Sequence, residues 1–427
     1  MRTAASFFLL ALFSIPLAPF AAAQSSAATD ASRNADLQLV VMLSRHGVRS
    51  PLGARGEYDK YSAAPWPVWS VPPGIQTAHG DQVIRLFGAW DRKEFAGQHL
   101  FAAAGCADAA HVTIVADNDE RTRATGKDLA EGMFPGCRIM VDSLPDGMKD
   151  PLFQPTWLRA VPHDEALTSA AVLGRMGGSP NNLTAAYHSQ LALLDHVLAG
   201  CGRAPTNPKR TSLLDLPAPV RYPAATLAEN LLLEYTDGMS QADTGWGCLD
   251  GATLRTIMQI DTAAWDFGFR TPAVARPYAS PILDRILKTM RQSATGAAVP
   301  GALGKPGDRL VIMAGHDTNI VTVAGALHID WVLDGRFDDP APGGALLFEL
   351  WRPRDGGKPF VRVEYTAQTL EQMRNAEPLT AANPPATAPI FVPGCSQADL
   401  SCTWEGFAAA LRQAIDPAYE NAPSAGR

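Results

Sequence analysis

The chain has 427 residues, of which 46% are hydrophobic and 19% charged, so it can bury an ordinary core and is long enough for one large domain with an insertion or for two domains. The formal net charge is −7, and nothing in this balance indicates a nucleic-acid partner or an anionic membrane surface. A site for an anionic ligand must therefore be a local basic pocket in an acidic protein.

The first residues have the pattern of a secretory signal peptide. Arg2 supplies a positive charge, residues 7–17 are almost wholly apolar, and the three alanines at 21–23 offer a small-residue cleavage site. The apolar run is shorter than the roughly 20 residues that a spanning helix needs, which disfavours the alternative of a membrane anchor. We assign residues 1–23 to a cleaved signal peptide and expect a periplasmic or secreted protein without membrane attachment.

The next segments predict the start of an α/β domain. Residues 24–36 are rich in Ser, Ala and Asp and predict a disordered lead-in. Residues 37–43 are mainly apolar and β-prone, which predicts a buried strand that runs directly into an Arg-His-Gly turn. Residues 50–78 hold several Pro and Gly together with Trp, and we expect a long ordered loop there. Apolar residues at helical spacing then predict a helix over residues 81–101.

Two further strand-and-helix units follow the same arrangement. Residues 112–116 are β-prone, and after an acidic turn the pattern predicts a helix over residues 122–133. Residues 309–314 form an apolar run, which predicts another strand, and a helix follows through residue 324. Two more strands are expected at residues 345–351 and 360–365.

The middle of the chain, residues 163–262, predicts helices joined by loops, with leucines at helical spacing. The fold class that we expect is therefore α/β: a mixed, largely parallel sheet flanked by helices, with an inserted α-helical cap domain. The α/β domain would comprise residues 37–162 and 263–427, and the cap domain residues 163–262.

Six cysteines follow the signal peptide, and an even number in a secreted chain favours disulfide bonds. They allow about 15 different pairings. The short spacing of Cys395 and Cys402 favours a bond that closes a small loop. No C-x-x-C spacing occurs, which argues against a zinc ribbon or a thioredoxin-like motif. No clustered His, Asp and Glu ligand set is visible in the sequence either, so we expect no metal and no cofactor.

Charged side chains follow three of the expected strands: Arg45, His46 and Arg49 the first, Arg121 the second, and His316 with Asp317 the third. Ligand sites in open α/β sheets form at the carboxyl ends of the strands. We therefore expect these side chains to meet in one pocket.

The residue types suit a phosphate ester. Arginine forks bind phosphate bidentately and stay charged, and Arg45 and Arg49 would both point inward if a helix began after His46. Gly47 would let the backbone approach the substrate closely. The two cations favour a neutral His46, and a neutral imidazole is a competent nucleophile. Asp317 is then the general acid for the leaving oxygen, and His316 a hydrogen-bond donor to the phosphate.

The motifs differ in how specifically they indicate a phosphatase. A lone Arg-His-Gly is a weak signal, whereas R-H-G-x-R-x-P at a strand end is specific. Arg121 is adjacent to Glu120 and near Asp119, so a plain surface salt bridge is an alternative for it, whereas Asp117 and Glu120 are candidates to orient the arginines. No G-x-S-x-G motif is present, which argues against an esterase with a serine nucleophile.

These motifs resemble those of the histidine acid phosphatase family, in particular the branch with bacterial phytases and periplasmic glucose-1-phosphatases. The segments that carry the resemblance are Arg45-His46-Gly47-Val48-Arg49-Ser50-Pro51, Asp117-Asn118-Asp119-Glu120-Arg121-Thr122-Arg123, Gly315-His316-Asp317-Thr318-Asn319, Gly245-Trp246-Gly247, Arg270-Thr271-Pro272 and Pro342-Gly343-Gly344. The resemblance covers nearly the whole mature chain.

The resemblance implies a role for each residue. His46 would become phosphohistidine, and Asp317 would be the proton donor. The phosphate would be held by Arg45, Arg49, Arg121 and His316. The substrate pocket would be lined by Asp117, Glu229, Arg270 and Thr318. Cys106–Cys137 and Cys395–Cys402 also resemble disulfides of this family, which leaves Cys201–Cys248 by elimination.

The substrate is less sharply defined by the resemblance than the reaction. Bacterial phytases often carry Thr-Lys after the R-H-G-x-R-x-P motif, and the lysine helps to hold a highly phosphorylated substrate; here Leu52-Gly53 stands in that place. The leucine is more like the glucose-1-phosphatases, whereas the segments around Arg121 and His316 are more like the phytases.

We therefore expect a metal-independent acid phosphomonoesterase with phytate (inositol hexakisphosphate) as its substrate. The first alternative is a sugar-phosphate phosphatase of the glucose-1-phosphatase type. A second, of another class, is a non-catalytic periplasmic protein that binds phosphate or inositol phosphates, although binding alone needs neither a nucleophile nor an acid. A mutase-like phosphotransferase fits poorly with a signal peptide. We expect a monomer whose partner is a phosphorylated small molecule.

Overall fold

The computed structural model describes residues 34–156, 164–203, 206–207, 209–216 and 223–420. The expected signal peptide, 1–23, lies outside these residues, as do residues 24–33 of the expected lead-in. Within the described part of the chain, no helix combines the length and the apolar character needed to cross a membrane.

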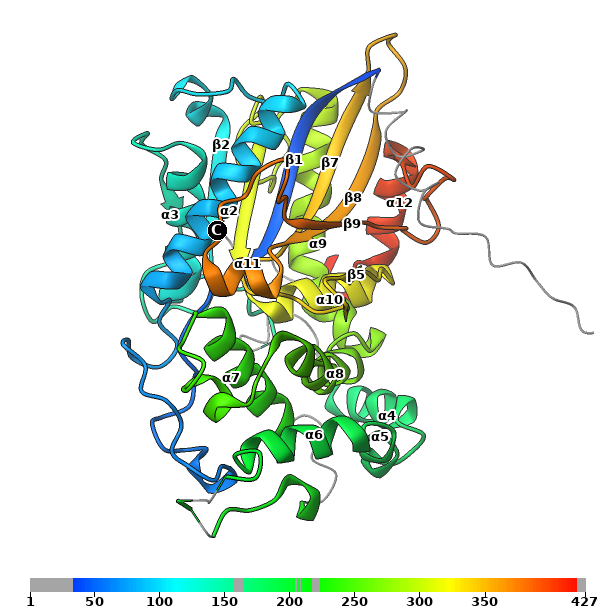
Figure 1. Cartoon of the computed structure of the whole chain (residues 1–427). Coiled ribbons are helices and arrows are strands. Elements are labelled where there is room, and N and C mark those ends of the chain that lie inside the picture. The colour runs from blue at the N-terminus through cyan, green and yellow to red at the C-terminus, as the bar shows by residue number, and fades with distance from the viewer. Residues whose placement is uncertain (1–33, 157–163, 204–205, 208, 217–222, 421–427) are drawn as a thin grey trace, which may run out of the picture.

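A mixed sheet with helices on both faces forms the larger part of the molecule, as expected (Figure 1). Its strand order is β10-β8-β7-β1-β4-β2-β3, and β9 pairs with β8. The strands are β1 (Ala35–Arg45), β2 (Val112–Ala116), β3 (Val141–Asp142), β4 (Leu310–Gly315), β7 (Ala345–Pro353), β8 (Phe360–Ala367), β9 (Ala386–Pro389) and β10 (Cys402–Thr403). β1, β4, β2 and β3 are parallel neighbours, whereas β7 runs antiparallel to β1.

The first strand is longer than the sequence pattern indicated. Residues 35 and 36 were expected in a disordered lead-in, and this expectation is wrong for them. Ala35 pairs with Pro353 and Asp36 with Arg352, so β7 extends the ladder beyond the apolar run. The backbone pairing, which a hydrophobicity pattern does not reveal, determines where β1 begins.

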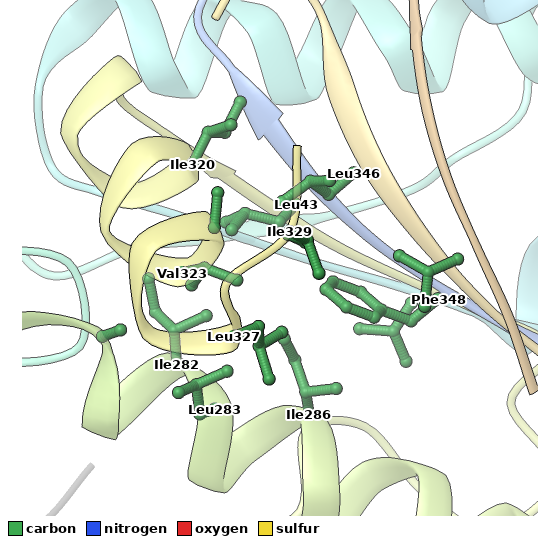
Figure 2. Close-up of a cluster of buried hydrophobic side chains, with 14 of the residues drawn as sticks. Leu43, Ile282, Leu283, Ile286, Ile320, Val323, Leu327, Ile329, Leu346 and Phe348 are labelled. Atoms are coloured by element: carbon green, nitrogen blue, oxygen red, sulfur yellow. The ribbon is translucent and has the colours of Figure 1, made fainter. Parts of the chain in front are cut away.

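Alternate residues of β1 pack on opposite faces of the sheet. Leu39, Val41 and Leu43 belong to the core that α9 (Pro272–Thr295), α10 (Asp317–Leu327) and α12 (Trp404–Ala414) cover, part of which is drawn in Figure 2. Val40 and Met42 face α2 (Ala78–Gly97) and α3 (Glu120–Met133). A strand that is buried on both faces has a continuous apolar run in its sequence, as residues 39–43 do.

The helical part contains α4 (Glu165–Arg175), α5 (Pro180–Ala186), α6 (His188–Leu198), α7 (Ala224–Thr236) and α8 (Gly251–Gly268). Its core includes the leucines of α6 and α7, together with Tyr58 and Tyr61 from the loop before α2 and with Leu370 and Met373 from α11 (Leu370–Asn375). The expected cap boundary at residue 262 falls inside α8, and the extent of a cap domain stays a prediction. Buried Ala263 and Ala264 continue the helical pattern past it.

The remaining short elements are η1 (Asp59–Tyr61), η2 (Ala107–His111), η3 (Leu213–Asp215), η4 (Thr244–Gly247), β5 (Val332–Leu333), β6 (Arg336–Phe337) and α13 (Pro417–Glu420). Three disulfides join Cys106 to Cys137, Cys201 to Cys248 and Cys395 to Cys402, which are the pairs named from the sequence. The second of them lies in the helical part and ties the end of α6 to η4.

Candidate active site

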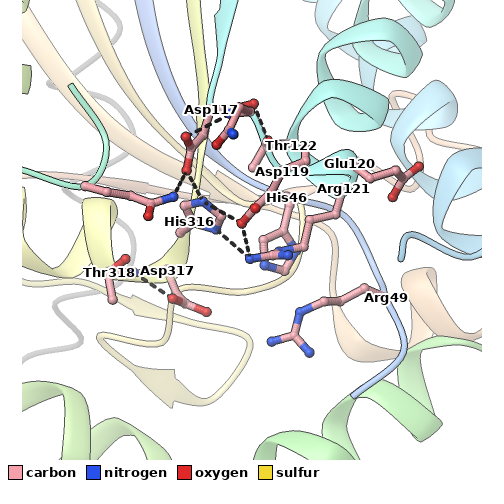
Figure 3. A network of polar contacts seen from close by, with 12 residues as sticks. His46, Arg49, Asp117, Asp119, Glu120, Arg121, Thr122, His316, Asp317 and Thr318 are labelled. Atoms are coloured by element: carbon pink, nitrogen blue, oxygen red, sulfur yellow. Dashed lines mark hydrogen bonds and ion pairs between the residues drawn. The ribbon is translucent and has the colours of Figure 1, made fainter. Parts of the chain in front are cut away.

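The carboxyl ends of β1, β4 and β2 lie side by side. His46 N–H donates to the Gly315 carbonyl at 3.0 Å, and Asp117 N–H donates to the Ala314 carbonyl at 3.0 Å. The charged residues that follow these strands are thereby brought together, as the strand pattern indicated. Figure 3 shows the side chains of His46, Arg49, Arg121 and Asp317 directed toward one space.

The turn after His46 differs from the expectation. No helix begins there: the chain bends, Arg49 forms a β-bridge with Gln76, and the next α-helix starts at Ala78. Gly47 is needed for packing, because an added Cβ would lie 2.7 Å from Ile84 Cγ1 and 2.9 Å from Gln76 Oε1, and its role in access of a ligand stays a prediction.

His46 lies in surroundings that favour its neutral form. The side chain is buried, and burial together with the charges of Arg121, Arg49 and Arg45 holds the pKa of His46 well below its usual value. In the neutral ring, Nδ1–H donates to the Gly47 carbonyl at 2.9 Å. This bond leaves Nε2 with a free lone pair, as a nucleophilic imidazole requires.

Arg45 and Arg49 are held by one carboxylate from the helical part. Glu229 Oε1, on α7, accepts from Arg45 Nη2 at 2.6 Å and from Arg49 Nη2 at 2.9 Å. Arg45 Nη1 also donates to the Pro340 carbonyl at 2.6 Å. These contacts fix two guanidinium groups side by side, which is the arrangement that phosphate oxygens require.

Arg121 and His316 form the second half of the cluster. Arg121 Nη2 contacts Asp119 Oδ2 at 2.7 Å and His316 Nδ1 at 3.4 Å. His316 Nε2 lies 2.7 Å from Asp117 Oδ2, which also accepts a hydrogen bond from the Gln154 amide. Arg121 therefore forms the salt bridge that was the alternative interpretation of this residue. It nevertheless lies in the same cluster of charged side chains as His316.

Asp317 is the first residue of α10 and lies 3.0 Å from Arg45 Nη2 through Oδ2. Burial alone would raise its pKa, but the charges of Arg45, His316 and Arg49 outweigh burial and keep the pKa of Asp317 below its usual value. Oδ1 accepts a hydrogen bond from Thr318 N–H at 2.7 Å, so the carboxylate is fixed on both oxygens.

The carboxylates that hold the arginines are not the ones expected. Asp117 and Glu120 were the candidates, but Asp117 binds His316, and Glu120 accepts from the Gln76 backbone N–H at 3.1 Å. Asp119 and Glu229 hold the arginines instead. Asp119, two residues before Arg121, was within reach of sequence reasoning; for Gln154 the sequence carries no signal.

Arg270 lies in a separate ion network. Its guanidinium donates to the Ile329 carbonyl at 2.8 Å, lies 3.2 Å from Asp338 Oδ2 and also pairs with Asp330. Thr318 hydrogen-bonds to Tyr278 through its side chain. A direct role of Arg270 or Thr318 in binding substrate stays a prediction.

Three potential metal-ligating side chains do come together, although no such cluster was visible in the sequence. Single ligand atoms of Asp117, Asp119 and His316 all lie within 4.8 Å of one another. The guanidinium of Arg121 contacts two of these residues. A metal cation would have to compete with that guanidinium, so the cluster fits an arginine better than a metal.

Comparisons with known proteins agree with this geometry. The sequence model of the histidine phosphatase superfamily (branch 2) matches residues 36–197 and 233–366. The chain is 32% identical to phytase AppA of Escherichia coli (strain K12), over 95% of this chain and 96% of that protein. It is 26% identical to a glucose-1-phosphatase of Salmonella typhimurium, over 84% and 87%. The structure of Hafnia alvei phytase in complex with tartrate superposes with a TM-score of 0.82 at 30% identity, over 90% of this chain and 98% of that one.

Proposed function

The chain belongs to the histidine phosphatase superfamily (branch 2), and from that premise we propose that it hydrolyses phosphomonoesters through a phosphohistidine at His46, with phytate as a substrate. It is a phosphatase of the histidine acid type, as its relatives are. The observation that carries the mechanism is the neutral, buried His46 surrounded by Arg45, Arg49 and Arg121.

In the first step the Nε2 lone pair of His46 forms a bond to phosphorus while the bond from phosphorus to the ester oxygen breaks. The three arginines and His316 bind the equatorial phosphoryl oxygens, where charge is concentrated in the transition state. The leaving oxygen takes its proton from the carboxyl group of Asp317. The products of this step are the alcohol and phosphohistidine.

In the second step a water molecule attacks the phosphohistidine. The Asp317 carboxylate accepts a proton from that water, the bond between nitrogen and phosphorus breaks, and inorganic phosphate leaves. His46 Nε2 regains its lone pair, and Asp317 is again protonated for the next cycle.

The lowered pKa of Asp317 indicates how substrate binding prepares the acid. The arginines that lower this pKa are the same groups that bind the phosphate. A bound phosphate neutralises part of their charge, so the pKa of Asp317 rises when substrate occupies the cluster. Acidic solution favours the protonated carboxyl group further.

Phytate is supported as a substrate by the phytases that this chain resembles in sequence and structure. A sugar phosphate is the second candidate, because the glucose-1-phosphatases are also related and because Leu52 is exposed beside the cluster. Gly53 stands where bacterial phytases often carry a lysine, and the ring of Tyr58 lies beside it. A Cβ at Gly53 would lie 2.5 Å from Tyr58 Cε2, so a longer side chain does not fit there without movement.

The proposal includes a periplasmic or secreted location and a monomer that acts on a phosphorylated small molecule without a cofactor. The signal-peptide pattern and the disulfides support the location. The non-catalytic binding protein is disfavoured, because binding alone does not require a neutral histidine beside a potential acid.

The test is a comparison of kcat/KM for phytate and glucose 1-phosphate at acidic pH, with His46→Ala as the control. We expect turnover of phytate by the wild type and none by the variant. A higher kcat/KM for glucose 1-phosphate would replace phytate by the second candidate. Wild-type activity in His46→Ala would contradict the mechanism for either substrate.

A further inference from the structure

A second pocket adjoins the phosphate cluster and has no role in the mechanism above. It has a volume of about 500 Å³ and is formed mostly by the loop between β1 and α2. Its walls include Tyr58, Trp66, Trp69, Arg55, Asp59 and Asn230. This volume lies within the range of small-molecule sites, roughly 300–1,000 Å³.

The residues that form the pocket border those of the site along the chain and in space. Ser50, in its wall, directly follows Arg49, and Asn230 directly follows Glu229, the carboxylate that holds Arg45 and Arg49. On the same loop, a Cβ added at Gly74 would lie 3.1 Å from Leu52 Cδ2 and 3.6 Å from Arg121 Nη1. The loop therefore borders the phosphate cluster, and a group bonded to the phosphate can extend along it.

The loop is held in place by hydrogen bonds at both of its ends. Near the site, Gly74 N–H donates to the Pro51 carbonyl at 3.1 Å, and Ser50 N–H donates to the Ile75 carbonyl at 3.1 Å. At the far end, Trp246 Nε1–H donates to the Pro65 carbonyl at 3.1 Å. These contacts preform the pocket.

The walls carry little net charge. Arg55 is the cation and Asp59 the anion among the lining residues, and Asp59 Oδ1 accepts a hydrogen bond from Trp66 N–H at 3.2 Å. A ligand with several phosphates would meet a single guanidinium here. The charge of the walls fits an uncharged group better.

The two tryptophans of the pocket differ in whether another aromatic ring packs against them. Trp66 is fixed edge-on against Trp246, with 4.9 Å between the ring centroids. Within the described residues Trp69 has no such ring partner, and Val68 beside it is 67% exposed. Trp69 is therefore the aromatic face that a ligand can cover, and the apolar face of a ring is what stacks on an indole.

We propose that this pocket binds the uncharged ring of the alcohol part of a phosphomonoester, a sugar or an aryl ring, while the phosphate occupies the arginine cluster. The inference rests on the proposed phosphatase mechanism, not on phytate as the substrate, and extends that mechanism to the leaving group of monophosphate esters. Trp69 is the specificity-determining residue, and esters with such a ring are hydrolysed faster than esters of equally acidic alcohols without one.

The experiment uses three esters of primary alcohols: phenethyl phosphate, glucose 6-phosphate and ethyl phosphate. Their leaving groups are similar in acidity, so differences in kcat/KM report contacts of the ring. We expect kcat/KM for at least one ring ester to exceed that for ethyl phosphate about tenfold in the wild type, as desolvated aromatic contacts give. Trp69→Ala removes this advantage and leaves ethyl phosphate within about twofold.

Ethyl phosphate is the internal control for folding, and Trp69→Phe, which keeps a ring, restores most of the preference. Phe391→Ala removes an exposed aromatic side chain outside the pocket walls and leaves all three values unchanged. If Trp69→Ala lowers kcat/KM for only one of the two ring esters, that ester shows whether the pocket binds a sugar or an aryl ring. Equal kcat/KM for the three esters in the wild type, or equal losses in Trp69→Ala, would overturn the inference. Turnover of phytate but of none of the three esters would also overturn the inference, whereas absence of turnover of phytate and of every ester by the wild type would instead overturn the proposed mechanism.

Discussion

At the scale of single residues, the arginines have two effects on their neighbours. Burial and the arginines together keep His46 neutral, which in the proposed mechanism favours attack, and the arginines also lower the pKa of Asp317, which works against proton donation until a phosphate is bound. In this mechanism the same positive charges keep the nucleophile neutral in the free enzyme and allow the acid to become protonated only when substrate is bound.

Asp317→Asn tests the acid. We expect kcat/KM for ethyl phosphate to fall by a factor of about 100 or more, because its leaving oxygen must be protonated, and kcat/KM for 4-nitrophenyl phosphate to fall less than about tenfold. The parameter kcat/KM is used because it reports the first step and not the hydrolysis of phosphohistidine. Equal losses for both esters would count against proton donation by Asp317.

The cluster of Asp117, Asp119 and His316 gives a prediction about metals. Because Arg121 contacts two of these side chains, we expect activity on 4-nitrophenyl phosphate to stay within about twofold after dialysis against EDTA. A parallel sample dialysed without EDTA is the control. Strong inhibition that a divalent ion reverses would show that a metal takes part.

At the scale of elements, the convergence of the three strand ends was predictable, and the source of Glu229 was less so. Carboxyl ends of neighbouring parallel strands share one edge of a sheet. The apolar runs before Arg45, Arg121 and His316 were therefore sufficient to predict that these side chains lie close together. Glu229 lies 184 residues from Arg45, on a helix whose docking depends on tertiary packing. Only the family resemblance indicated it.

The same limit applies to Gly47 and to the start of β1. The sequence shows a glycine, but whether its missing Cβ makes room for a ligand or for Gln76 and Ile84 depends on contacts from another segment. The pairing of Ala35 with Pro353 likewise depends on β7, far away in the chain. Patterns within one segment do not carry such information.

The close packing of α2 against α3 predicts a difference between two glycines. A Cβ at Gly132 would lie 2.2 Å from the Arg85 carbonyl oxygen, whereas a Cβ at Gly97 would meet nothing within 4 Å. We expect Gly132→Ala to reduce the free energy of unfolding by about 1–3 kcal/mol through overpacking. Gly97→Ala, the matched control at the end of α2, should be neutral or slightly stabilising. Equal melting temperatures for the two variants would contradict this account of the interface.

At the scale of the whole molecule, several buried carboxyl groups favour acidic conditions. Burial raises the pKa of Glu234 to about 8 and that of Asp128 to about 7. Burial is also the main reason that the pKa of Glu349 is raised, and the charge of Glu364 contributes to it. A carboxyl group with a raised folded-state pKa gives its full stability below its unfolded pKa of about 4, and that stability is lost as pH rises toward the folded value.

We therefore expect the melting temperature to be higher near pH 5 than near pH 8.5, because these three groups lose stability across that window. Glu234→Gln and Glu349→Gln should reduce the difference between the two melting temperatures. Glu131→Gln, at an exposed position in α3, is the matched control and should leave the difference unchanged. A melting temperature that rises from pH 5 to pH 8.5 would contradict the prediction.

The measurement that tests the central claim most directly is the detection of phosphohistidine. The enzyme is mixed with 4-nitrophenyl phosphate, quenched in alkali, digested and examined by mass spectrometry. We predict one phosphoryl group on the peptide that contains His46, more of it in Asp317→Asn, where loss of the base slows hydrolysis of the intermediate, and none in His46→Ala. A phosphoryl group on another residue, or none in Asp317→Asn while product is still released, would contradict the mechanism.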